Sequence, residues 1–303
     1  MHRHGPERRH GPARPGGGRP GGPPPSTTGT HGLARVLSRL GLVSRTEAAR
    51  WIALGRVTVG GAVVRDPERR TDSDTERIAV DGTPIRAAKR LYYVMNKPAG
   101  VLTAARDQAG RKTVYDVLRE AIKTSGRAPG VGPGKDVPPG PAAAPEGVET
   151  GPMPWLLPAG RLDAMTLGLL VFTNDTSFAR LLTDERAAIP KTYEVKVRRC
   201  MPDEAVERLR HGVTLDDGYR TRPAEVRVLK SNEGTTWLEV TIREGHNRQV
   251  RRMCEVVGHE VVKLRRVRIG PIEIGDLPAG AVRVLTRREI DAVRELAEHP
   301  PAT

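Results

Sequence analysis

The sequence predicts an α+β fold built from two units: a small module of two short helices and a small sheet, then a larger unit with a mainly antiparallel, mixed sheet. Two observations predict it. Helical spacing of apolar residues is confined to short segments, and runs of β-branched residues follow one another with few long helical segments between them. Strands with few crossover helices between them favour antiparallel pairing over the parallel sheet of an alternating α/β fold.

The 303 residues leave room for two modest domains with appendages. Residues 1–31 are rich in Gly, Pro, Arg and His, and so few apolar groups cannot offset the entropy of ordering, which predicts a disordered basic tail. A second Gly/Pro/Ala-rich segment, residues 124–158, predicts a flexible insertion. The expected order is therefore the tail, the module at 32–86, and the larger domain at 87–299, which contains the insertion.

Composition favours a polyanionic partner. The formal net charge is +14 at neutral pH, which indicates nucleic acid rather than a membrane surface or a small molecule. Aromatic residues make up only 3% of the chain, so phosphate contacts and shape are favoured over a platform of stacking rings. No apolar run approaches the roughly 20 residues of a membrane span. The N-terminus lacks a secretory signal and the two cysteines have no metal-ligand spacing, which favours a cytoplasmic protein without a metal site.

The elements of the small module follow from local signals. Apolar residues at helical spacing predict a helix over 33–40. Ser44 followed by Glu47 predicts a capping box, which starts a second helix that reaches Gly55. Gly60-Gly61 between two β-branched triplets predicts a hairpin, and a strand over 78–80 closes the unit.

The larger unit is predicted to begin with a strand over 91–95 that runs into a turn. The further predicted strands are 169–173, 193–197, 224–229, 237–242, 261–267 and 282–285. The predicted helices are 178–182, 203–211, 248–257 and 287–298.

Three segments carry candidate chemistry. Asp163 lies in a turn before an apolar strand, which suits a nucleophile or general base; a helix cap or an ion pair with Arg161 remains the alternative. Tyr193 opens a strand, either as a core tyrosine or as a ring that stacks on a flat substrate. Arg248, Arg251 and Arg252 would share one face of a helix, in a stretch with eight basic residues and three Glu from 243 to 268, which favours phosphate binding over a solvated face.

The module resembles the S-four (S4) RNA-binding domain. The resemblance lies in the run from Leu40 to Ala49, with Ile52 and the Gly55–Val59 segment, although Gly60-Gly61 replaces the typical Asn-Gly. It implies that Arg45, Arg50 and Arg56 face an RNA backbone, where otherwise they would be solvated helix-surface arginines.

The larger unit resembles the ribosomal RNA pseudouridine synthases of the RsuA/RluB type. The motifs that carry the resemblance are Gly160-Arg161-Leu162-Asp163 with Thr166 and Gly168-Leu169-Leu170, Lys191-Thr192-Tyr193, Glu244-Gly245 with Asn247 to Met253, Gly258-His259, Lys97-Pro98 with Gly100, and Gly110-Arg111 with Thr113-Val114. The similarity spans about residues 32 to 290. The insertion, and the absence of a His-Pro pair in the 182–185 stretch, depart from the family pattern.

The resemblance implies the roles of the site. Asp163 is the catalytic aspartate that acts on a flipped-out uridine, Tyr193 stacks on its base, and Arg251 pairs with the aspartate, with Arg248 as the other candidate for that pairing. Arg161 and Arg252 would hold phosphates, and Arg111 would contribute to RNA binding. The isomerisation consumes nothing, so no cofactor and no metal are expected.

The expected substrate is ribosomal RNA or a precursor ribosomal particle, with the large subunit favoured over the small one and the protein acting as a monomer. Two rival functions stay open: a non-catalytic RNA-binding assembly factor, and an N-glycosidase. The glycosidase would need a second carboxylate, for which Asp175 is the nearby residue.

Overall fold

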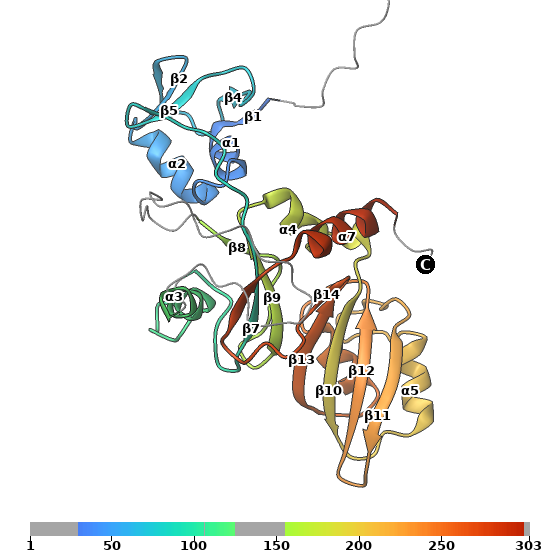
Figure 1. The fold of residues 1–303 in the computed structure, drawn as a ribbon. Helices are drawn as coiled ribbons and strands as arrows, with labels where there is room; N and C mark the ends of the chain where they lie inside the picture. The colour runs from blue at the N-terminus through green and yellow to red at the C-terminus, as the bar shows by residue number, and fades with distance from the viewer. Residues whose placement is uncertain (1–29, 106, 125–154, 300–303) are drawn as a thin grey trace, which may run out of the picture.

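The computed structural model describes residues 30–105, 107–124 and 155–299 (Figure 1). Most of the predicted tail and most of the predicted insertion lie outside these residues. Two boundaries differ from the prediction. His31, assigned to the tail, pairs with Thr71, and residues 155–158, assigned to the insertion, belong to the fold, because Leu156 is buried and Leu157–Pro158 form a strand.

The N-terminal module has the predicted helices and hairpin. Its elements are β1 (His31–Gly32), α1 (Leu33–Arg39), α2 (Arg45–Ala53), β2 (Val57–Val59), β3 (Ala62–Val64), β4 (Arg70–Thr71), β5 (Ile78–Val80) and β6 (Thr83–Pro84). β1 pairs with β4, and the other strands form a sheet in the order β3-β2-β5-β6. The Ser44 side chain caps α2 as predicted, but the Glu47 carboxylate accepts a hydrogen bond from the Trp51 indole instead of completing the capping box.

The larger domain is built on a nine-stranded sheet in which every strand pair except one is antiparallel, so the α+β prediction is confirmed. The path is β11-β12-β10-β13-β9-β7-β15, and β9 and β13 form the parallel pair. The strands are β7 (Tyr92–Lys97), β8 (Leu157–Pro158), β9 (Leu167–Thr173), β10 (Lys191–Arg198), β11 (Glu225–Ser231), β12 (Thr235–Ile242), β13 (Val261–Ile269), β14 (Ile272–Glu273) and β15 (Val282–Val284).

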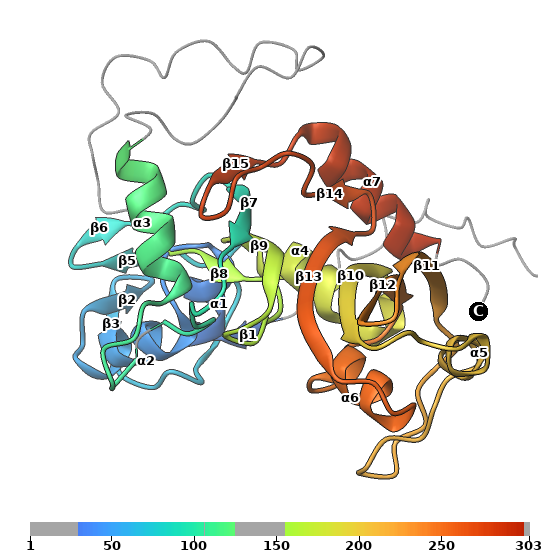
Figure 2. The same cartoon turned by 90° about the horizontal axis from the view of Figure 1, so that it is seen from below.

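Helices cover this sheet unevenly (Figure 2). They are α3 (Val114–Thr124), α4 (Thr176–Thr183), α5 (Asp203–Arg210), α6 (Gln249–Val256), α7 (Arg287–Glu298) and the 3-10 turn η1 (Glu185–Ala187). The sequence analysis missed α3, although Thr113 followed by Asp116 is an N-terminal signal: the Asp116 carboxylate accepts from the Thr113 backbone and hydroxyl. Among the helices of the described ranges, none has the length and apolar content needed to cross a bilayer.

The parallel β9–β13 contact depends on Gly168. This glycine has φ +103°, and a Cβ built on it would lie 2.1 Å from the Arg266 carbonyl oxygen. Only a residue without a side chain lets the two backbones approach so closely. Gly168 therefore joins the strand that follows Asp163 to the strand that carries Arg266.

The two domains meet at the end of β9. Asn174 accepts a hydrogen bond from the Leu91 backbone and donates one to the Lys89 carbonyl, and a Cβ on Gly41 would lie 2.9 Å from its amide nitrogen. α1 contacts α4 at the same place. The module therefore contacts the larger domain through the buried amide of Asn174 and the closely packed Gly41.

Candidate active site

A pocket of about 180 Å³ opens beside the start of α6. It is smaller than the roughly 300–1,000 Å³ of sites that bury drug-sized ligands, and this size suits a single base. The 160–163 turn, the start of β10, the end of β12 and the 245–250 segment form its walls. Its lining includes Asp163, Thr166, Lys191, Tyr193, Ile242, His246, Arg248, Leu264 and Arg266.

The Asp163 turn is held by the 97–103 segment. Lys97 is fully buried, and its ammonium donates to the carbonyls of Pro98, Ala164 and Thr166 at 2.9 to 3.1 Å. The Thr103 hydroxyl donates to the Leu162 carbonyl at 2.7 Å. Burial lowers the pKa of Lys97 to about 8, although the charge of Asp163 opposes this shift. The buried ammonium group of Lys97 therefore fixes the backbone that follows Asp163.

Asp163 faces a basic side chain across the pocket. The Asp163 carboxylate lies 3.6 Å from the guanidinium of Arg248, with 36% of the Asp163 side chain exposed. Of the alternatives left open, the structure gives Asp163 an ion pair, but with Arg248 rather than Arg161. The carboxylate is thus paired with a cation, partly shielded and reachable from solvent.

Of the two arginines considered for this pairing, the structure pairs Arg248 with Asp163, and not Arg251. Arg248 has φ +49° and precedes α6. The direction of its side chain therefore cannot be predicted from helical spacing. Arg251 is 9% exposed and donates to the Val261 carbonyl, while its Nε has no hydrogen-bond partner among the described residues. Burial, followed by the charge of Arg248, lowers the pKa of Arg251. Arg251 therefore lies behind Arg248, as a buried charge near Asp163.

Arg252 occupies a third environment. Its guanidinium pairs with both Asp216 and Asp217, and only 14% of the side chain is exposed. Arg248, Arg251 and Arg252 therefore do not share one helix face. Arg161 is exposed at the pocket rim, where a phosphate can reach it, whereas Arg252 is already neutralised.

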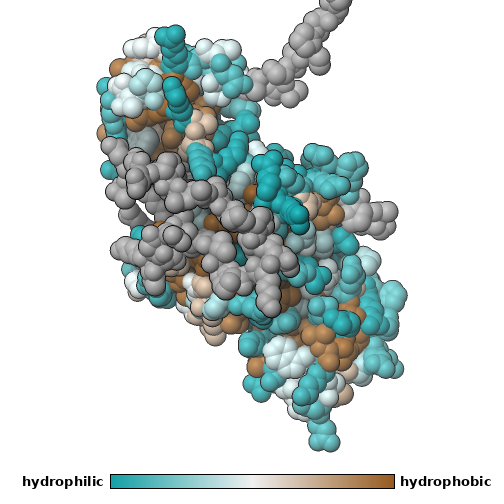
Figure 3. Space-filling model, in the orientation of Figure 1, coloured by the Kyte–Doolittle hydropathy of each residue, from teal (hydrophilic) through white to brown (hydrophobic). Residues whose placement is uncertain are grey.

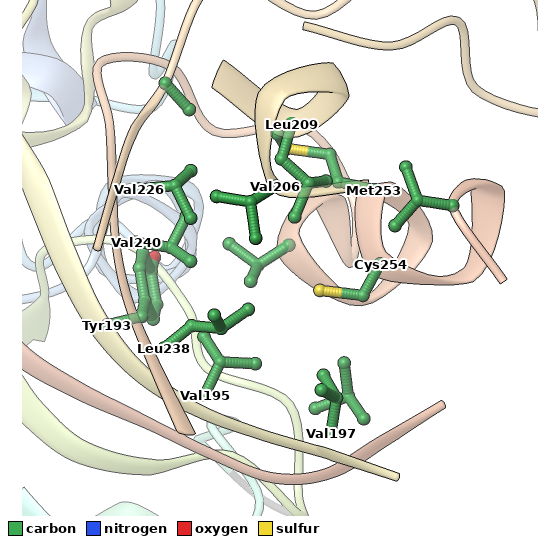
Figure 4. Close-up of a cluster of buried hydrophobic side chains, with 14 of the residues drawn as sticks. Tyr193, Val195, Val197, Val206, Leu209, Val226, Leu238, Val240, Met253 and Cys254 are labelled. Carbon is green, nitrogen blue, oxygen red and sulfur yellow. The ribbon is translucent and has the colours of Figure 1, made fainter. Parts of the chain in front are cut away.

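Tyr193 combines the two interpretations considered for it. The residue is 9% exposed and belongs to the core cluster formed by β10, β12, α5 and α6 (Figure 4), and it also lines the pocket. Packing against Val240 fixes the ring at one end of the cluster (Figure 4). A ring held in this way can support a planar base at no cost in side-chain entropy.

Two buried cations without a predicted role lie at the inner wall of the pocket. Lys191 is 7% exposed and Arg266 is 4% exposed. Burial, followed by the charge of Arg266, lowers the pKa of Lys191 to about 8. Arg266 donates to the Leu169 carbonyl, so it also ties β13 to β9. Their place in the pocket depends on the packing of strands that are distant in sequence.

A buried carboxylate organises the opposite wall. Glu244 is 1% exposed and accepts hydrogen bonds from the Tyr219 hydroxyl, the Arg222 backbone and the Gln249 amide. Burial and the hydrogen bond to Glu244 raise the pKa of Tyr219 to about 12. The Tyr219 ring stacks on His246, with 3.5 Å between centroids. This network fixes the segment from which Arg248 projects.

Asp175, the second carboxylate considered for glycosidase chemistry, has a structural role. It caps α4, accepts from the Tyr92 hydroxyl and pairs with Arg90 and Arg294. Its side chain is 3% exposed and does not line the pocket. Within the described part of the chain, no cluster of three or more His, Cys, Asp or Glu side chains could hold a metal ion.

The arginines expected to contact RNA outside the pocket are exposed but paired. Arg45 lies 2.9 Å from Glu68, Arg50 lies 4.0 Å from Glu47, and Arg111 lies 2.8 Å from Asp107. Arg56 pairs with Asp81, and its guanidinium lies 4.9 Å from the centre of the Trp51 ring. A phosphate would have to displace a carboxylate at each of these positions.

Known proteins are similar to this chain over most of its length. The family model described as RNA pseudouridylate synthase matches residues 146–256, and the S4 domain model matches residues 32–76. The ribosomal large subunit pseudouridine synthase B of Bacillus subtilis (strain 168) is 34% identical over 269 residues, which cover 88% of this chain and 97% of that protein. An uncharacterized RNA pseudouridine synthase of Aquifex aeolicus is 32% identical, over 85% of this chain and 91% of its own length.

A solved structure described as a pseudouridylate synthase has a TM-score of 0.55 and 23% identity, and the match covers 86% of this chain and 98% of that one. At this identity the match supports the fold alone.

Proposed function

The chain belongs to the RNA pseudouridine synthases with an S4 domain, and from that premise we propose that it isomerises a uridine of large-subunit ribosomal RNA, with Asp163 as the catalytic carboxylate. The observation that carries the residue assignment is the solvent-reachable Asp163, which pairs with Arg248 and lines the same pocket of single-base size as Tyr193.

The residues of the pocket divide the reaction between them. The target nucleotide leaves its stack, and the Tyr193 ring supports its base. Asp163 attacks the nucleoside or removes a proton from it while the N1–C1′ bond breaks. The uracil then rotates and C5 bonds to C1′, while the bond to Asp163 breaks or, in the alternative, Asp163 returns the proton that it removed. The C5 hydrogen leaves as a proton, and N1 takes up a proton. Arg248 pairs directly with the carboxylate, and Arg251 adds a second, buried positive charge nearby.

The relatives support the choice of subunit. The name of the Bacillus subtilis relative specifies the large ribosomal subunit, and it matches this chain over nearly its full length. We further propose that the protein acts in the cytoplasm as a monomer, on ribosomal RNA or on a precursor particle. The exposed arginines of the module, Arg45, Arg50 and Arg56, together with Arg111 and Arg161, would contact its phosphates.

Release of tritium from RNA labelled at uracil C5 tests the proposal, because the new carbon–carbon bond must expel that hydrogen. Transcripts of both ribosomal RNAs are incubated with the wild-type protein and with the Asp163→Asn variant. We expect release from the large-subunit transcript by the wild-type protein and none by the variant, with RNA affinity nearly unchanged.

Other outcomes contradict separate parts of the proposal. Release by Asp163→Asn at a substantial rate would remove Asp163 from the mechanism, and release from the small-subunit transcript alone would reverse the choice of subunit. Free uracil among the products would indicate an N-glycosidase. RNA binding without release, on naked RNA and on precursor particles alike, would indicate a non-catalytic assembly factor.

A further inference from the structure

The open face of the β10–β13 sheet carries an unbalanced row of charges. Lys196 of β10 lies opposite Trp237 of β12 on one side and Lys263 of β13 on the other, and Trp237 also lies opposite Lys230 of β11. The ammonium groups of Lys196 and Lys263 lie 5.7 and 5.9 Å from the centre of the Trp237 ring. We call Lys263, Lys196, Trp237 and Lys230 the lysine–tryptophan row; it crosses three strand spacings, or about 14 Å.

The adjacent row on the same face is balanced. There, Arg265 pairs with Glu194 at 3.4 Å, and Arg227 pairs with Glu239 at 3.0 Å. These residues occupy the same four strands, two positions along β10 and β12 from the lysine–tryptophan row. Beyond the row, Arg198 pairs with Glu260. Acidic partners are therefore available on this face and are used on both sides of the row.

The lysine–tryptophan row has no such partner. No carboxylate among the described residues lies within ion-pair distance of Lys196, Lys230 or Lys263. Like charges directly opposite each other on a sheet are destabilising. Lys196 and Lys263 lie directly opposite each other without an acidic partner, and this arrangement is unfavourable for folding. A bound polyanion would stabilise it.

The row is separate from the catalytic pocket. Tyr193, Leu264 and Ile242 point to the side of the sheet that packs on α5 and α6, whereas Lys196, Trp237 and Lys263 alternate with them and point to the other side. Figure 1 shows α5 behind the strands, so the uncovered face points toward the viewer. Figure 3 shows this face, at lower right, as a mixed hydrophilic and apolar surface outside the grey atoms.

We propose that the lysine–tryptophan row is a second RNA-binding surface, which holds a nucleotide of the ribosomal RNA outside the segment that enters the pocket. A base stacks on the Trp237 indole and the flanking phosphates bind Lys196 and Lys263. Exposed cation–π contacts are weak, so the ammonium groups can move to phosphates at little cost. The proposal rests on the proposed function only for the identity of the RNA.

Equilibrium binding of the full chain tests this surface without requiring turnover. The probes are a large-subunit ribosomal RNA transcript and a short unstructured oligouridylate, each titrated over a range of salt concentrations. We expect Trp237→Ala to weaken binding of the transcript about tenfold, as loss of one stacked base does. The double variant Lys196→Glu with Lys263→Glu should weaken binding at least as much and lower the salt slope by about two.

The matched control is Arg288→Glu, an exposed arginine on α7 with no ion pair among the described residues. It changes the net charge by the same amount per residue but lies outside the row. Thermal unfolding of each variant shows that it folds. Binding losses in Trp237→Ala and in the double variant, with little change in Arg288→Glu, support the proposal.

Two results would overturn it. Wild-type affinity of Trp237→Ala for both probes would exclude stacking at this ring. Competition by polyglutamate as effective as that by oligouridylate would show a surface that recognises acidic chains in general. Because binding is measured directly, a protein that binds through the row but releases no tritium would contradict the proposed function and leave this inference standing.

Discussion

The cations of the N-terminal module and those of the pocket differ in burial and in pairing. In the module, Arg45 is 62% exposed and pairs with Glu68, and Arg50 is 72% exposed near Glu47. In the pocket region, Lys97 and Lys191 are buried against backbone carbonyls, and burial lowers the pKa of both to about 8. Exposed pairs contribute little to stability and exchange easily, whereas buried charges are fixed by folding before substrate arrives. The module is therefore suited to phosphate contacts that can adjust. The pocket is suited to an electrostatic field that is fixed before RNA binds.

The largest expected effect is on the packing that creates the pocket. Gly168→Ala would place a Cβ 2.1 Å from the Arg266 carbonyl oxygen, so we expect a loss of more than about 4 kcal/mol in the free energy of unfolding. The matched change in the module is Gly61→Ala, where φ is +87° and no atom lies within 4 Å of the new Cβ. Only backbone strain of about 1–2 kcal/mol is expected there. Urea unfolding of both variants measures the difference, and equal losses would contradict it.

The second prediction concerns Lys97, whose ammonium group holds the Asp163 turn. Lys97→Met removes three hydrogen bonds to carbonyls around this turn. A displacement of about 1 Å at a catalytic group can lower a rate about 100-fold, and we expect kcat to fall by up to this factor with RNA affinity nearly unchanged. Single-turnover tritium release gives the rate. The control is Lys112→Met, at an exposed lysine that pairs with Glu120. Loss of affinity without loss of rate would exclude a positioning role for Lys97.

The third prediction uses the lowered pKa of Lys191. Because its pKa is about 8 rather than the usual 10.5, the side chain is charged below this pH and becomes neutral above it. RNA affinity should therefore decrease between about pH 7 and about pH 9, as the pocket loses a cation. Lys191→Met should bind more weakly at the lower pH and lose most of this dependence. If the variant keeps the full wild-type profile, another group is responsible for it.

The smallest effect is expected at the exposed pairs of the module. Arg45→Ala removes one candidate phosphate contact but also frees Glu68, so we expect affinity to fall only a few-fold. The salt slope should decrease by slightly less than one, and turnover of bound RNA should not change. Binding titrations at several salt concentrations provide the test. An unchanged slope would remove Arg45 from the RNA contacts.

Much of this architecture was predictable because its signals are local. Ser44 and the Gly60-Gly61 pair identify a helix start and a hairpin within a few residues, and the structure has both. Alternation of buried and exposed residues likewise predicts β12, whose side chains alternate along its whole length. α3 had a comparable signal in Thr113 and Asp116, which the sequence analysis did not use.

The arrangement of the site was only partly predictable. The turn before β9 and the start of β10 made Asp163 and Tyr193 candidates, and the resemblance to the pseudouridine synthases implied their roles. The choice between Arg248 and Arg251 depends on a single backbone angle, the positive φ of Arg248 before α6, which helical spacing cannot express. Burial of Lys97 under a turn that lies more than sixty residues away in sequence was equally hidden.

The sequence by itself determined the two-domain order, most of the secondary structure, the family and the candidate aspartate, since these depend on periodicity, turn residues and short motifs. Tertiary structure decided which cation pairs with Asp163, which arginines pair with carboxylates and which lysines are buried. It also separated the balanced row of the open sheet face from the lysine–tryptophan row. The physical reason is that charge pairing and desolvation depend on which strands lie side by side, and the pairing of β10 with β13 brings together residues that are up to about eighty positions apart.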